Sequence, residues 1–105
     1  MFRRTVHPGQ ILKGELEEIA ITATELARQI NVPANRVSQI IAGKRAITGD
    51  TALRLGHWFS MSPQFWMNLQ AQFDLMTAEH GAGDVIEKLP IYPKSTTQNE
   101  QPMSQ

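Results

Sequence analysis

Four polar side chains on one short segment have the chemistry to recognise the edges of DNA bases. At about 100° per residue, a helix over residues 33–42 would point Val37, Ile40 and Ile41 to one side. The other side would carry Asn35, Arg36, Ser38 and Gln39. Arginine can make two hydrogen bonds to guanine, asparagine or glutamine can make two to adenine, and serine can bond to several bases. The same pattern also fits an ordinary amphipathic helix with a solvated polar face.

The residues around this segment predict two helices joined by a tight turn. Thr22 stands three residues before a glutamate, which is a capping box that starts a short helix. Asn31 ends this helix, because asparagine tolerates the left-handed conformation. Pro33 opens the next helix at a position that needs no amide hydrogen, and Gly43 stops it. Two short helices with such a turn predict a helix-turn-helix over residues 22–43.

The charge of the chain is neutral in total but uneven along the sequence. Lysine and arginine together number 10, as do aspartate and glutamate, so the formal net charge is zero. No acidic residue occurs in residues 26–49, although this window contains Arg28, Arg36, Lys44 and Arg45. We expect Lys44 and Arg45, directly after Gly43, to contact phosphates beside the preceding helix. A local basic surface is compatible with nucleic acid, but an ordinary solvated surface fits the charges equally well.

Three further helices are expected around this motif. Pro8 opens the first helix, Thr48 caps the fourth, and Ser62 with Pro63 starts the fifth, which is the longest. Each of them has apolar residues at helical spacing, which predicts one buried side. The expected inward-facing residues are Leu12, Leu16 and Ile19 in the first helix, Ala52, Leu55, Gly56 and Phe59 in the fourth, and Trp66, Leu69, Phe73 and Met76 in the fifth.

The chain is expected to form one all-α domain of five helices followed by an extension. No stretch has a convincing strand alternation, and 105 residues suffice for one domain with a modest core. The fifth helix is expected over residues 63–80, because Gly81, Gly83 and later prolines end regular structure. Residues 1–80 are the predicted helix-turn-helix domain and 81–105 a flexible C-terminal extension. The end of the extension, KSTTQNEQPMSQ, has almost nothing to bury and is expected to be disordered.

Composition disfavours several other functions. The chain has no cysteine, so neither a disulfide nor a thiolate site can form. No apolar run approaches the roughly 20 residues that span a bilayer, and no apolar core follows the basic start. A cytoplasmic protein with no membrane partner is therefore expected.

An enzymatic function is not expected, and neither are catalytic residues, a metal or a cofactor. His7, His57 and His80 are far apart in the sequence and have no metal-binding spacing. His80 together with Glu79 and Asp84 could form only a weak metal site. A histidine near a helix end commonly caps carbonyl groups instead.

Longer stretches of the sequence resemble a known family. The phage-repressor-like superfamily has a helix-turn-helix similar to TELARQINVPANRVSQIIAGKRAIT. More narrowly, HigA-type antitoxins resemble this chain in HPGQIL, GKRAITGDTALRLGHWF and SPQFWMNLQAQFDL, in the same order, over about residues 6–77. The resemblance implies a five-helix phage-repressor-like fold, a homodimer, and binding to a palindromic operator of double-stranded DNA in the protein's own promoter. It also implies a HigB-like ribonuclease toxin, which the antitoxin neutralises by direct contact.

The resemblance also assigns a DNA-binding site. The recognition helix of the family falls on residues 33–42 of this sequence. The start of the second helix, near Ala23 and Thr24, is expected to approach the DNA backbone. Together with the basic loop, the predicted DNA-binding residues are Thr24, Ala34, Asn35, Arg36, Ser38, Gln39, Lys44 and Arg45.

The fifth helix is the expected dimer interface. It carries more apolar side chains than a small domain can easily hide, and large exposed apolar patches usually mark an interface. Phe73, Leu75 and Met76 are expected at the interface, whereas Trp66 and Leu69 are expected in the core of each monomer.

An acidic patch on the first helix is a candidate toxin-binding surface. Glu15, Glu17 and Glu18 would complement a basic, RNA-binding toxin, although an ordinary solvated face is equally compatible with them. No sequence motif marks a toxin-binding surface. A stand-alone phage-type transcriptional repressor without a toxin partner therefore remains the alternative function.

Overall fold

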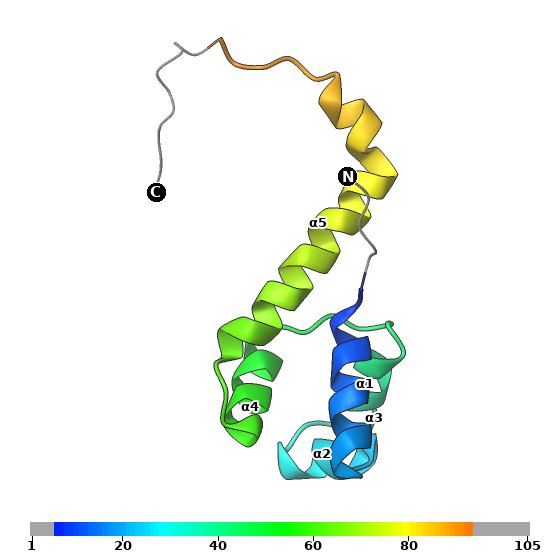
Figure 1. Ribbon diagram of the computed structural model, residues 1–105, viewed down its shortest axis with the longest axis vertical. Coiled ribbons are helices and arrows are strands. Elements are labelled where there is room, and N and C mark those ends of the chain that lie inside the picture. The colour runs from blue at the N-terminus through cyan, green and yellow to red at the C-terminus, as the bar shows by residue number, and fades with distance from the viewer. Residues whose placement is uncertain (1–5, 94–105) are drawn as a thin grey trace.

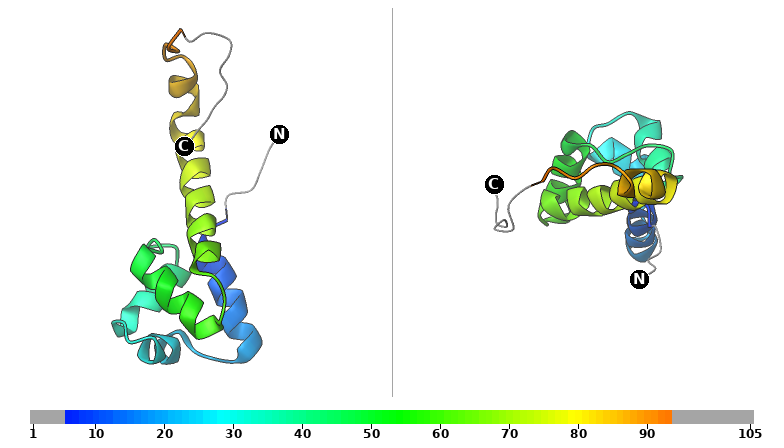
Figure 2. Two further views of the ribbon diagram at one scale, coloured as in Figure 1. Left: turned by 90° about the vertical axis from the view of Figure 1, so that its left-hand side faces the viewer. Right: turned by 90° about the horizontal axis from the view of Figure 1, so that it is seen from above.

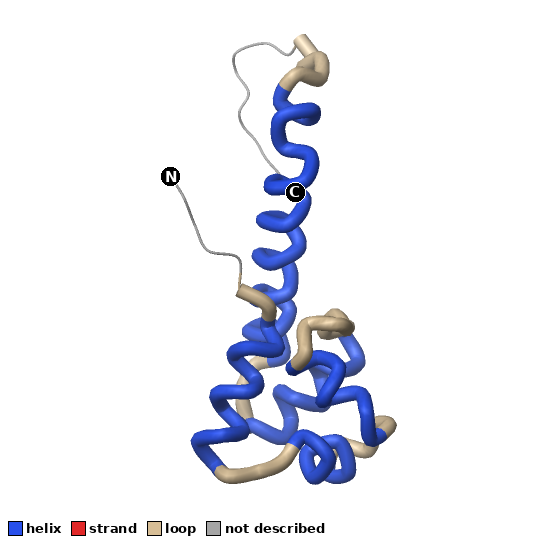
Figure 3. The backbone as a smooth tube through the Cα atoms, turned by 90° about the vertical axis from the view of Figure 1, so that its right-hand side faces the viewer, coloured by secondary structure: helices blue, strands red, loops and turns tan. Residues whose placement is uncertain are grey.

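The computed structural model describes residues 6–93, and this part of the chain consists of helices and loops without a strand (Figures 1 and 3). The helices are α1 Pro8–Ile19, α2 Ala23–Gln29, α3 Ala34–Ile41, α4 Gly49–Phe59 and α5 Pro63–Glu87. The predicted all-α class with five helices is confirmed. The end of the chain, which is expected to be disordered, lies outside the described residues. No helix within residues 6–93 is long and apolar enough to cross a membrane.

Side-chain caps start most of the helices where the sequence predicts them. Thr22, Thr48 and Ser62 each accept a hydrogen bond from a backbone amide of the following turn, over 3.0, 3.4 and 3.1 Å. Such a bond satisfies an amide that has no partner within the helix. In α1 the cap is His7, whose Nδ1 accepts from the amide of Gly9 over 2.9 Å. The sequence did not predict this fourth cap.

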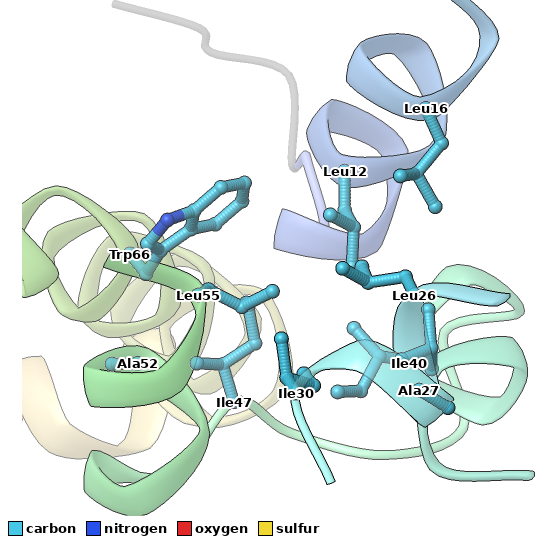
Figure 4. Packing of buried hydrophobic residues seen from close by; sticks show 11 residues of the cluster. Leu12, Leu16, Leu26, Ala27, Ile30, Ile40, Ile47, Ala52, Leu55 and Trp66 are labelled. Atoms are coloured by element: carbon cyan, nitrogen blue, oxygen red, sulfur yellow. The ribbon is translucent and has the colours of Figure 1, made fainter. Parts of the chain in front are cut away.

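The core lies between α1 to α4 and the first half of α5 (Figure 4). Most of the predicted inward-facing residues are buried, among them Leu12, Leu55 and Trp66. The prediction is wrong for Ile19, which is 44% exposed. Because α1 ends at Ile19 and Ala20 is left-handed with φ of 58°, the chain turns away there. Ile21, on the far side of this turn, packs against the core instead.

The fifth helix is longer than predicted. It continues through Gly81 and Gly83 and ends at Glu87, so the predicted end at residue 80 is wrong. A glycine inside a helix costs only about 1 kcal/mol relative to alanine, which is not enough to end a long helix. The helix stops shortly before Pro90, because a proline restricts the residue before it. The predicted boundary between domain and extension falls inside α5, and the division itself stays a prediction.

Only the first half of α5 packs against other helices. It contacts α4 and α1, and beyond these contacts the helix projects away from the other four (Figures 1 and 2). Leu75 and Val85 on the projecting part are 71% and 67% exposed. The fold therefore has a packed body and a projecting helical segment that exposes some large apolar side chains.

The close approach of α1 to α3 fixes the position of α3. Gly9 is buried against the backbone of α3, and a Cβ at this position would collide with the carbonyl oxygen of Ile40. Glycine permits this approach because it has no side chain. The start of α1 therefore supports the end of the helix that carries the predicted recognition residues.

Candidate nucleic-acid interface

Helix α3 has the two faces that the sequence predicts. Val37 and Ile40 are fully buried, and Ile41 is partly buried against the core. Ala34, Asn35 and Ser38 are exposed. The core therefore holds α3 by its apolar side and leaves a polar surface facing outward.

The start of α3 differs by one residue from the prediction. Pro33 is the N-cap, with φ of −55° and ψ of 145°, and the helix begins at Ala34. The fixed φ of proline suits both the N-cap and the first position of a helix. The extended ψ of Pro33 shows that this residue lies outside the helix. Its carbonyl still accepts from the amide of Arg36 over 2.9 Å.

The turn between α2 and α3 is held by α4. Asn31 adopts a left-handed conformation with φ of 60°, as predicted. Nη1 of Arg54 donates to the carbonyl oxygens of Ile30 and Asn31 over 2.8 and 3.2 Å. Nε of Arg54 also donates to Asp50 over 2.8 Å. Arg54 thus satisfies carbonyl groups that the end of α2 leaves without helical partners, and no sequence pattern indicated this contact.

Arg36 does not lie along the exposed face with the other polar residues of α3. Its side chain is half-buried, and Nη1 donates to the hydroxyl of Thr51 in α4 over 3.5 Å. Its Nε is buried and has no hydrogen-bond partner within residues 6–93. A buried donor without a partner is costly. The side chain is therefore turned toward α4 in a position that leaves one of its donors unsatisfied.

Gln39 and Arg45 join α3 to the loop that follows it. Nε of Arg45 donates to Oε1 of Gln39 over 2.9 Å. The backbone supports the same arrangement, since the amide of Lys44 donates to the carbonyl of Gln39 over 2.9 Å. Gly43 has φ of 78°, the left-handed conformation expected for a glycine that ends a helix. The exposed face of α3 is thus continuous with the basic loop.

The basic charges of this region are not equally available. Arg28 forms an ion pair with Glu25 in the same helix. Hydrogen bonds from Arg28 and then from Gln29 lower the pKa of Glu25 to about 2, so its carboxylate stays charged and offsets Arg28. Lys44 and Arg45 are exposed and have no acidic partner among the residues that the structure describes. The loop, rather than α2, therefore carries the free positive charge.

The last of the predicted DNA-binding residues, Thr24, lies on α2 and not on α3 or the basic loop. Thr24 lies exposed in the first turn of α2. Within residues 6–93, no group of three histidine or acidic side chains lies close enough together to hold a metal ion. His80, Glu79 and Asp84 all lie on α5.

The comparisons with known proteins agree with this geometry. A helix-turn-helix family model matches residues 12–57. "Antitoxin HigA-1" of Vibrio cholerae is 39% identical over 74 residues, which are 70% of each chain. A HigA-family addiction module antidote protein from Coxiella burnetii has a TM-score of 0.83 at 42% identity, covering 86% of this chain and 100% of that one. Antitoxin HigA of Pseudomonas aeruginosa, solved with the higBA promoter, has a TM-score of 0.81 at 45% identity over 86% and 98% of the two chains.

The fold and the polar face beside a basic loop define a helix-turn-helix DNA-binding protein. Within this class, the chain belongs to the HigA family of antitoxins. These proteins are DNA-binding regulators and not enzymes.

Proposed function

We propose that this protein represses its own operon by binding a palindromic operator and neutralises a HigB-like ribonuclease toxin. The observation that carries the DNA-binding part is the continuity between the exposed face of α3 and the loop of Lys44 and Arg45. That loop has no acidic partner within residues 6–93. The promoter complex of the Pseudomonas relative supports the same assignment.

In this proposal the predicted site residues have two roles. Asn35, Ser38 and Gln39 read base edges in the major groove. Lys44, Arg45 and Thr24 contact the DNA backbone, which sets the position of the protein on the duplex. Arg36 also reads a base, after its side chain leaves Thr51. An acceptor on a base would satisfy the Nε donor that has no partner in the free protein. Ala34 borders this surface and allows a close approach of the helix.

The proposed dimer forms through the projecting part of α5. Within α5, apolar side chains recur at positions 75 and 82 and again at 78 and 85, which is the heptad spacing of paired helices. Of the predicted interface residues, Leu75 is the most exposed, with 71% of its surface accessible. Phe73 and Met76 are half-buried, and the ring of Phe73 packs against His7 at 4.7 Å. A second copy on this surface would give the two-fold symmetry that a palindromic operator requires.

The toxin-binding part of the proposal rests on the family and on the acidic patch of α1. Glu15, Glu17 and Glu18 are exposed, and Glu17 pairs with Lys13 over 3.5 Å. An exposed acidic patch would assist the docking of a basic toxin. The proposed location of the protein is the cytoplasm, because both proposed ligands, DNA and the toxin, are intracellular.

Two experiments test the proposal. The protein is titrated onto DNA from immediately upstream of its coding sequence, with a scrambled duplex as control, and saturable binding of the upstream duplex is expected. The neighbouring reading frame is then expressed alone and together with this protein. Growth arrest by the neighbour alone, relieved by co-expression, is expected of an antitoxin. DNA binding without any such relief would favour the stand-alone repressor.

A further inference from the structure

Gln70 is a buried polar side chain of α5 that reaches the loop after the recognition helix. It is 5% exposed. Its Oε1 accepts a hydrogen bond from the backbone amide of Ile47 over 2.8 Å. Its Nε2 donates to Oδ1 of Asp74, one turn further along α5, over 2.9 Å. The carboxamide therefore bridges two parts of the chain that lie 23 residues apart in sequence.

The loop of residues 42–48 is held at both ends. At its start, the amides of Gly43 and Lys44 donate to the carbonyl groups of Ile40 and Gln39 over 3.0 and 2.9 Å. At its end, the side chain of Ile47 is 2% exposed and belongs to the core (Figure 4). The residues between these ends are exposed. The path of Lys44 and Arg45 is therefore set by α3 on one side and by Ile47 on the other.

The hydrogen bond to Gln70 fixes the main chain at that second end. Without an acceptor, the amide of Ile47 would be buried and unpaired, which is costly. Asp74 sets the orientation of the Gln70 carboxamide, because an ionised carboxylate can only accept hydrogen bonds. It takes the NH₂ group and thereby turns the oxygen of Gln70 toward Ile47.

We infer that Gln70 is a positioning residue for DNA binding, which holds the Lys44–Arg45 loop in place from α5. The inference rests on the proposed DNA-binding function. A loop that is already ordered loses less conformational entropy on binding than a mobile one. The two basic side chains then meet phosphates without a prior rearrangement of the loop. Gln70 itself is buried and does not touch DNA.

The test compares operator binding by the parent, Gln70→Met and the control Gln72→Met. Methionine has about the length of glutamine but cannot accept from Ile47. The side chain of Gln72 is exposed and makes no hydrogen bond within residues 6–93, so its variant should bind like the parent. For Gln70→Met we expect the affinity to fall roughly tenfold or more, and the slope of the salt dependence to decrease by about 0.9 for each phosphate that the loop no longer reaches. Amide hydrogen exchange at Ile47 should accelerate in the same variant.

A double variant separates positioning from general stability. In Gln70→Glu, Asp74→Asn the introduced carboxylate can accept from the Ile47 amide and from the introduced carboxamide. The summed charge of the two positions does not change. We expect this pair to restore the affinity and the salt dependence that Gln70→Met loses. If Gln70→Met does not fold, the exposed Asp74→Ala is used instead, with a smaller loss in the same direction expected.

Two results would overturn the inference. One is a folded Gln70→Met variant with fast exchange at Ile47 but parental affinity and salt dependence. The other is a folded double variant with slow exchange at Ile47 whose affinity stays low. If the parent itself does not bind the upstream duplex, the proposed function fails first. That outcome is distinguishable, since in the other two the parent binds.

Discussion

Arg45 donates from Nε to Oε1 of Gln39 over 2.9 Å, so that a residue of the basic loop and a residue of α3 present one joint surface. A glutamine whose oxygen is already occupied still has its NH₂ group to donate. A guanidinium that bonds through Nε keeps both terminal nitrogen atoms for an acceptor. The pair can therefore contact DNA as a unit, with each side chain limiting the freedom of the other.

The first prediction is that Gln39 and Arg45 are energetically coupled in DNA binding. Gln39→Ala and Arg45→Ala should each weaken operator binding, and the double variant should lose less than the sum. The expected coupling is about 0.5 to 3 kcal/mol, as for residues in direct contact. Titrations of the four proteins measure it. Lys44→Ala combined with Gln39→Ala is the control, and the losses of binding free energy in this pair should add. If the losses also add for Gln39 and Arg45, the hydrogen bond between these two side chains has no role in DNA binding.

The second prediction separates base reading from backbone contact. Asn35→Ala should cost about 1 to 3 kcal/mol at the operator and remove the preference for one base pair in each half-site. Lys44→Ala should instead weaken binding to all sequences alike and flatten the salt dependence. Both positions are exposed, so stability should change by less than about 0.5 kcal/mol. Binding to operators with single base-pair changes measures the difference. An Asn35→Ala protein with unchanged preferences would remove Asn35 from the site.

The third prediction concerns the contact of α1 with α3. Gly9→Ala should lower the free energy of unfolding by about 1 to 3 kcal/mol or more, as overpacking does, because the added methyl group meets the carbonyl of Ile40. Gly14→Ala is the matched control, since a Cβ there meets nothing within 4 Å. It should stabilise the protein by about 0.5 to 1 kcal/mol. Chemical denaturation of both variants measures these changes, and equal effects would contradict the close approach.

The fourth prediction is a loss of stability below neutral pH that comes from His7. Burial lowers the pKa of His7, although the negative charge of Asp74 opposes this shift. Below the usual value of about 6.5, the unfolded state therefore binds more protons than the folded state. The contribution of His7 to the free energy of unfolding is therefore fully present above that pH. It decreases as the pH falls toward the lowered pKa. His7→Asn, which can still cap α1, should remove this step from the pH dependence of thermal unfolding.

A second loss of stability, at lower pH, is expected when Glu25 becomes protonated. Its pKa in the folded protein is about 2, against a usual 4.5. The contribution of Glu25 is therefore present above about pH 4.5 and is lost as the pH falls toward 2. Glu25→Gln should abolish this lower step and leave the step of His7 unchanged. Identical pH profiles for parent and variant would show that the Arg28 ion pair does not stabilise the fold.

The fifth prediction concerns the projecting part of α5. Leu75→Glu should convert a dimer to a monomer, because it places a charge in the proposed interface. The stability of the monomer body should change little, since Leu75 is 71% exposed. Sedimentation at several concentrations measures the change, with Gln72→Glu as the control of equal charge. A monomeric parent protein would refute the proposed interface.

Short-range patterns predicted most of the helix-turn-helix. The Thr22 cap, the left-handed Asn31 and the glycine stop at Gly43 all depend on neighbouring residues. Helical periodicity likewise predicted which side of α3 is buried, with Val37 and Ile40 inside. The predicted DNA-binding residues follow from the same periodicity together with the family resemblance, and their contacts with DNA stay predictions.

Contacts between helices determined the features that short-range sequence patterns did not predict. Arg36 belongs to the polar side of α3 by periodicity, yet its guanidinium lies against Thr51 because α4 passes beside it. Arg54 and Gln70 hold the two loops of the motif through contacts with residues 23 or 24 positions away. A hydrogen bond over such a separation leaves no periodic trace in the sequence. It exists only because packing of the apolar residues brings α4 and α5 beside the backbone groups that need a partner.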